Sequence, residues 1–141
     1  MITLTLRDVM TAAPVTVSPE DPIGEARRAM LVHGVRHLPV CEGGTVVGVV
    51  SQRDLDFVRG VRDELVEPLR VADAMSAFPF VAGPDAEVED VARTMADAKY
   101  GSVVVVEEGK PVGVFTMVDG MALLAALLHD GMFMPPVRAA G

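Results

Sequence analysis

Aromatic residues and cysteine are scarce in this chain. Its 141 residues include no Trp, one Tyr, five Phe and a single cysteine, Cys41. A core with so few aromatic side chains has to be built from Val, Leu, Met and Ala. Val favours strands, whereas Ala and Met favour helices. One cysteine excludes an intrachain disulfide and suits a reducing compartment, so we expect a cytoplasmic protein.

Long hydrophobic runs and an excess of positive charge are also missing. Residues 1–7 have no basic lead and no long apolar core, so we expect no signal peptide. The most apolar helical run, 121–128, is far shorter than the roughly 20 residues that span a bilayer. The net charge of −8 repels phosphate backbones. We therefore expect neither a membrane nor a nucleic acid as a partner.

Comparison of the chain with itself reveals an internal repeat. Gly48 and Gly113 are 65 positions apart (113 − 48 = 65), and the same offset aligns the two halves without a gap. Identical pairs include Asp8/Asp73, Met10/Met75, Pro14/Pro79, Pro19/Pro84, Arg28/Arg93, Met30/Met95, Val40/Val105, Gly44/Gly109 and Asp54/Asp119. Two unrelated segments of similar composition would rarely keep such a register, so the sequence predicts a duplicated unit.

Each copy predicts the same order of elements. After a leader with a Met come a short strand, a helix, two strands with a tight link, and a second helix. The links at 42–44 and 107–109 are short enough to make each strand pair an antiparallel hairpin. The core-facing stripes of the first helices are Ile23, Ala26, Met30 and His33 in one copy, and Val88, Val91, Met95 and Ala98 in the other.

These patterns predict a mixed α/β (α+β) fold. Two β-α-β-β-α repeats, 6–60 and 71–129, are each too small to bury both faces of a sheet, so they should pack as one pseudo-two-fold module. We expect a helical linker at 61–70 and a flexible C-terminal tail at 130–141.

The residues with the clearest chemistry follow the second hairpin strand of each repeat. Ser51 and Asp54 come directly after an apolar strand that carries Gly48, and Thr116 and Asp119 repeat the arrangement. A mid-strand glycine leaves room for another backbone or a ligand. Ser/Thr followed three residues later by Asp is also a common helix cap, so capping and ligand binding are both open, and the two roles can coexist.

The two copies together resemble a pair of CBS domains, the cystathionine-β-synthase-type repeats. The features that carry the resemblance are the Asp-x-Met leader, the His-Leu-Pro-Val strand at 37–40 and the doubled Gly-x-x-x-Gly-x-x-Ser/Thr-x-x-Asp. The resemblance implies a regulatory module with two clefts that bind adenosine-containing ligands, such as AMP, ADP, ATP, S-adenosylmethionine or NAD-type molecules. It also implies a homodimer and no obligatory cofactor.

The resemblance assigns residues to each cleft by position. A ribose diol needs a carboxylate, matched by Asp54, and a phosphate needs hydroxyl, N–H and cationic donors. The first cleft would comprise Thr16, Val17, Val35, Arg36, His37, Leu38, Pro39, Ser51, Arg53 and Asp54. The second would comprise Val81, Tyr100, Gly101, Ser102, Thr116 and Asp119. The second has Val118 where the first has Arg53, so we expect it to bind phosphate less well.

Other functional classes have less support in the sequence. The histidines have no matching nucleophile and Cys41 no base at a defined spacing, so we expect no enzymatic activity. A metal site built from His33, His37 and Cys41 would draw on a helix end and two strand positions, and we expect none. The main alternative is a ligand-free dimerisation or docking module that regulates an unknown partner protein.

Overall fold

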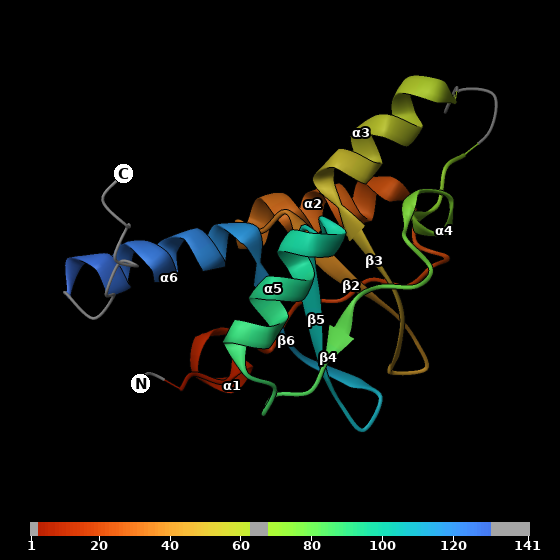
Figure 1. The fold of residues 1–141 in the computed structure, drawn as a ribbon. Coiled ribbons are helices and arrows are strands. Elements are labelled where there is room, and N and C mark those ends of the chain that lie inside the picture. The colour runs from red at the N-terminus through yellow and green to blue at the C-terminus, as the bar shows by residue number, and fades with distance from the viewer. Residues whose placement is uncertain (1–2, 63–67, 131–141) are drawn as a thin grey trace.

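The computed structural model describes residues 3–62 and 68–130, which form two similar units (Figure 1). The second repeat has the predicted order, with β4 (Val81–Ala82), α5 (Val88–Ala98), β5 (Ser102–Glu107), β6 (Lys110–Thr116) and α6 (Met117–His129). The first has α2 (Ile23–His33), β2 (His37–Glu42), β3 (Thr45–Ser51) and α3 (Gln52–Val61). Its opening strand is reduced to a parallel bridge between Val17 and Val40.

Both predicted hairpins are present and have the same register. His37 pairs with Ser51 and Leu38 with Val50 in the first, just as Ser102 pairs with Thr116 in the second. Each hairpin also has a β-bulge at the equivalent place, after Val40 and after Val105. Because the repeats share apolar pattern and turn chemistry, they fold into the same local structure.

The leaders of the two repeats are exchanged. The first leader forms α1 (Leu6–Val9) and β1 (Thr11–Ala12), and β1 pairs with β6 of the second repeat. The second leader forms α4 (Val71–Ala74), and Ser76 bridges to Val49 of the first repeat. Leu6 is accordingly buried in the second core, while Leu69 and Val71 are buried in the first. Neither sequence repeat therefore completes its own core.

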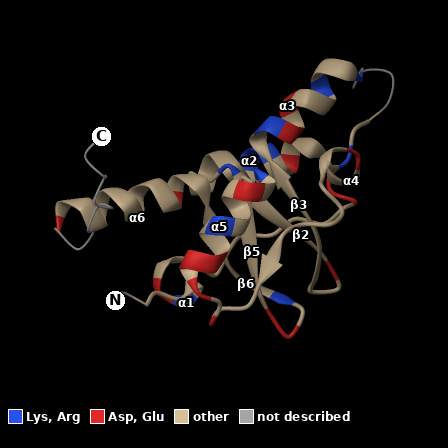
Figure 2. Cartoon of the chain, viewed as in Figure 1, with Lys and Arg blue, Asp and Glu red and all other residues tan. Residues whose placement is uncertain are grey.

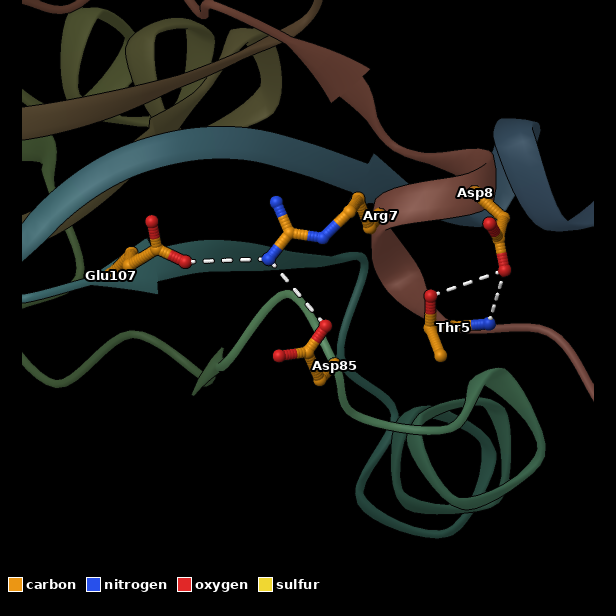
Figure 3. Close-up of polar contacts among 5 residues, drawn as sticks. All are labelled: Thr5, Arg7, Asp8, Asp85 and Glu107. Carbon is orange, nitrogen blue, oxygen red and sulfur yellow. Dashed lines mark hydrogen bonds and ion pairs between the residues drawn. The ribbon is translucent and has the colours of Figure 1, made fainter.

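Polar contacts hold the first leader on the second repeat (Figure 3). The backbone N–H of Leu6 donates to the carbonyl of Ala86 at 3.0 Å. The Arg7 guanidinium lies 3.4 Å from carboxylate oxygens of both Asp85 and Glu107. These ion pairs are exposed to solvent, so burial of Leu6 contributes more to the attachment than they do.

The mid-strand glycines make room for the exchanged leaders. A Cβ on Gly48 would lie 2.8 Å from the carbonyl oxygen of Ser76 and 2.9 Å from Sδ of Met75. A Cβ on Gly113 would lie 2.8 Å from Cγ of Met10 and would also meet its Sδ. Of the two alternatives that the sequence left open at Gly48, the structure shows the close approach of another segment.

Some sequence predictions were wrong at the ends of helices. His33 and Ala98 are exposed, because burial of α2 and α5 ends at Met30 and Met95, one turn before their C-caps. The helix predicted across the linker 61–70 ends at Val61, and Arg62 has an extended backbone. Residues 63–67 and the tail at 131–141 lie outside the described residues.

Candidate functional site

The candidate site is built on the first turns of α3 and α6. Ser51 is the N-cap of α3: its backbone N–H donates to Oδ2 of Asp54 at 2.8 Å, and its Oγ accepts from the N–H of Asp54 at 3.1 Å. Thr116 and Asp119 form the same reciprocal pair at α6, with distances of 2.9 and 3.2 Å. The capping role weighed from the sequence is thus realised in both repeats.

Capping leaves both carboxylates chemically able to bind a ligand. Each uses Oδ2 for the cap, and an ionised carboxylate has a second oxygen and about four acceptor positions in all. Asp54 and Asp119 are half-buried, as are Ser51 and Thr116. The helices behind them are long enough for the N-terminal dipole and unpaired N–H groups to favour an anion nearby.

The first-cleft residues divide by exposure. Thr16, Arg36 and Arg53 are exposed, and Val35 and His37 are half-buried. Val17, Leu38 and Pro39 are buried, with Val17 and Leu38 in the first hydrophobic core. The backbone of Val17 is already bonded on both sides, donating to Pro39 and accepting from Cys41. These three side chains are buried, whereas those of Thr16, Arg36 and Arg53 are exposed to solvent.

The second-cleft residues are less polar. Val81, Tyr100 and Gly101 are exposed, while Ser102 is buried at 9% exposure. The Tyr100 ring stacks on Phe80, with ring centroids 5.1 Å apart and planes at 24°. Sequence reasoning did not include Phe80, although its place directly before Val81 and the scarcity of aromatic residues could have drawn attention to it.

His37, predicted for the first cleft, lies at the boundary between the two repeats. Its Nε2 lies 3.5 Å from the position a Cβ of Gly101 would take, so the imidazole reaches the second repeat. Burial lowers the pKa of His37 from its ordinary value of 6.5. The charges of Asp54 and Asp119 both act to raise this pKa, and the Arg36 guanidinium acts to lower it. The histidine therefore experiences the carboxylates of both repeats.

Within 3–62 and 68–130, no group of three or more His, Cys, Asp or Glu side chains is placed to hold a metal ion. No helix in that same part of the chain is long and apolar enough to cross a bilayer. A groove of about 340 Å³ lies away from the predicted site residues and is lined by Thr3, Leu4, Glu87, Val88, Glu89, Leu123 and Leu127.

Comparison with known proteins agrees with this architecture. A CBS domain model matches residues 6–58 and 71–126. Inosine-5'-monophosphate dehydrogenase of Korarchaeum cryptofilum is 37% identical over 115 residues, which make up 81% of this chain but 22% of the dehydrogenase.

Solved structures with the same fold include the following two. One, from Vibrio cholerae and described as an acetoin utilization protein (AcuB), has a TM-score of 0.80 at 25% identity, covering 95% of this chain and 100% of that one. The other is CBSX2 of Arabidopsis thaliana in complex with AMP, with a TM-score of 0.74 at 29% identity, covering 89% of this chain and 98% of that one. The predicted fold class and family resemblance are confirmed.

Proposed function

Because the chain belongs to the CBS domain family, we propose that it is a regulatory module that binds an adenosine-containing ligand in its two clefts. One observation carries the proposal: a hydroxyl and a carboxylate stand together at the start of α3, and the same pair recurs at the start of α6. AMP, ADP, ATP, S-adenosylmethionine and NAD-type ligands all present the ribose that such a carboxylate recognises.

The geometry supports a division of roles within the first cleft. The second oxygen of Asp54 accepts from the ribose hydroxyls. Ser51, the N–H groups at the start of α3 and the exposed Arg53 and Arg36 guanidinium groups stabilise phosphate charge. The AMP complex of CBSX2, at 29% identity, supports an adenine nucleotide as the first ligand to test.

The second cleft suits a ligand with little negative charge. Its hydroxyl and carboxylate match the first, but Val118 is 68% exposed where the first cleft has Arg53, and Gly101 stands in place of Arg36. The stacked pair Phe80 and Tyr100 offers a flat apolar surface for a purine. We infer that nucleotides bind the first cleft more tightly than the second.

Thermal unfolding with a ligand panel tests the proposal. A ligand at about 100 times its Kd should stabilise the fold by about 2.7 kcal/mol. For a chain of 141 residues that is a rise in Tm of about 9 °C. No shift with AMP, ADP, ATP, S-adenosylmethionine or NAD would refute nucleotide binding.

Carboxylate variants test the order of the clefts. Asp54→Ala should weaken ATP binding more than Asp119→Ala does, because the first cleft has the arginines. Asp8→Ala is the matched control: Asp8 accepts the Thr5 N–H at 2.8 Å in the same kind of cap at α1, and it belongs to neither predicted cleft (Figure 3). A larger loss in Asp119→Ala than in Asp54→Ala would contradict the predicted order.

Helix α6 favours a second candidate function, a dimerisation or docking module. No residue of this fully described helix is buried, and Figure 2 shows it almost free of charge along its length. Its exposed side chains include Met117, Val118, Met121, Leu124 and Leu128, with exposures from 39% to 68%. An apolar surface of this kind is typical of an interface, and we infer that a second copy of the chain covers it.

Sedimentation velocity tests the inferred homodimer. Met121→Glu with Leu128→Glu should convert a dimer to a monomer, because two charges would be buried at the interface. Phe78→Glu is the control, since Phe78 is 95% exposed and lies outside α6. A monomeric wild-type chain at micromolar concentration would contradict the homodimer and leave α6 as a surface for a different protein.

A further inference from the structure

His37 begins β2 in the first repeat, yet its imidazole lies against the second. Its Nε2 is 3.5 Å from the position that a Cβ on Gly101 would occupy. That distance is an ordinary van der Waals contact, so the imidazole packs directly against Gly101, the residue before the second hairpin. The equivalent residue in the other repeat is Ser102, which is 9% exposed and does not titrate near neutral pH. The boundary therefore has a histidine from one repeat without a counterpart from the other.

Short series of contacts connect His37 with both capping pairs. On its own side, His37 is the register partner of Ser51, which is hydrogen-bonded to Asp54. On the other side, the carbonyl of Gly101 accepts the backbone N–H of Met117 at 3.1 Å, in the first turn of α6. That turn is closed by Asp119. The residue that holds this imidazole is thus linked through hydrogen-bonded backbone to the turn that contains Asp54, and its Nε2 lies beside the residue bonded to the turn that contains Asp119.

The charged groups that act on His37 come from two helices, α3 and α6, and from Arg36, the residue before β2. Asp54 on α3 and Asp119 on α6 favour the imidazolium, whereas Arg36 disfavours it. Burial has the largest influence on the pKa of His37, and it also disfavours the charged imidazolium. At neutral pH the unliganded protein accordingly has a neutral imidazole at a place where a positive charge would be near both clefts.

We propose that His37 serves both clefts, and that proton uptake by its imidazole couples an anionic ligand in one cleft to an anionic ligand in the other. The inference rests on the proposed nucleotide function and adds its regulation. A phosphate in either cleft favours the imidazolium, so the first ligand to bind recruits a proton from solvent. The second ligand then finds the positive charge already present and binds more tightly, by reciprocal linkage.

The coupling has a defined pH dependence. It is present where His37 is neutral in the free protein and protonated in the complex. At lower pH, where the free protein is already protonated, the first ligand has no proton to recruit and the coupling disappears. Between the pKa of the free protein and that of the liganded state, affinity falls as pH rises by as much as tenfold per pH unit for one linked proton, and above the pKa of the liganded state it no longer changes with pH.

A histidine titration by NMR tests the shared position without any ligand. The chain has three histidines, and His33→Gln and His129→Gln identify the His37 signal by elimination. Asp54→Asn and Asp119→Asn should each lower the pKa of His37, because each removes a carboxylate that favours the charged imidazole. An Asp119→Asn protein with an unchanged His37 titration would overturn the inference, because His37 would then serve the first cleft alone.

Calorimetry with ATP tests the linkage itself. Titrations at pH 7 in two buffers of different ionisation enthalpy should reveal proton uptake by the wild-type protein of up to one proton per module. His37→Gln should take up less, and the decrease in its affinity with rising pH should be smaller. His33→Gln is the control and should match the wild type, since His33 is exposed at the end of α2.

The outcomes separate the inference from the function on which it rests. Failure of ATP and the other nucleotides to bind the wild-type protein refutes the proposed function and the coupling together. ATP binding with the same proton uptake in His37→Gln refutes the coupling and leaves the proposed function intact. If His37→Gln does not fold, the His37 pKa of the wild type with saturating ATP decides: a rise supports the coupling, and an unchanged value overturns it.

Discussion

Replacing Gly48 by Ala should destabilise the protein by forcing the exchanged leader away from β3. The new Cβ would lie 2.8 Å from the carbonyl oxygen of Ser76. That oxygen accepts the N–H of Val49 at 3.1 Å, and the N–H of Ser76 donates back to Val49 at 2.9 Å. Because the obstructing atom belongs to a hydrogen-bonded backbone, relief of the clash has to weaken the bridge between leader and strand.

The expected magnitude follows from the cost of overpacking. An added methyl group without space costs about 1–3 kcal/mol. With an unfolding entropy of about 2.1 cal/mol/K per residue, a chain of 141 residues loses about 3 °C of Tm per kcal/mol. Gly48→Ala should therefore unfold about 3–10 °C below the wild type.

Differential scanning calorimetry with two comparisons tests the reasoning. Gly60→Ala adds the same methyl group where no atom lies within 4 Å, in the helix α3, and should raise stability by about 0.5–1 kcal/mol. Gly113→Ala meets only the flexible side chain of Met10 among its nearest neighbours, so Met10→Ala should rescue part of its loss. A Gly48→Ala protein as stable as Gly60→Ala would refute the leader contact.

Three further predictions concern stability. Lys99 is the C-cap of α5 and has a left-handed backbone with φ of 60°, whereas the equivalent C-cap in the first repeat is Gly34. Lys99→Gly should raise Tm, because it relieves left-handed strain of about 1 kcal/mol. Burial lowers the pKa of His37, so urea unfolding should show stability falling as pH decreases below 6.5, and His37→Gln should reduce that fall. The Arg70 N–H and then the Arg62 side chain lower the pKa of Asp73 from 3.8. The ionised carboxylate of Asp73 should therefore increase the free energy of unfolding above pH 3.8, and this increase should be lost on further acidification. In acid unfolding followed by circular dichroism, the stability of Asp73→Asn should decrease less with falling pH than that of the wild type.

Local chemistry explains why much of the fold could be predicted. The 65-residue offset, the apolar strands and the short links specify each hairpin, because turn geometry and side-chain alternation act over a few neighbouring residues. The pair Ser51 and Asp54 likewise formed the cap that its spacing allows. The predictions that failed, at His33, Ala98 and the linker helix, depended on how far a helix stays in contact with the core.

What the sequence by itself determined is the duplicated β-α-β-β-α unit and the residues that begin α3 and α6. The tertiary structure alone decided the exchange of leaders, since two similar repeats offer each leader two similar docking surfaces. It also decided that Gly48 lies against Ser76 and Met75 of the exchanged leader. The approach of His37 to Gly101 and the influence of both Asp54 and Asp119 on its pKa were also decided there, because a contact across the boundary between repeats leaves no trace in the spacing within either one.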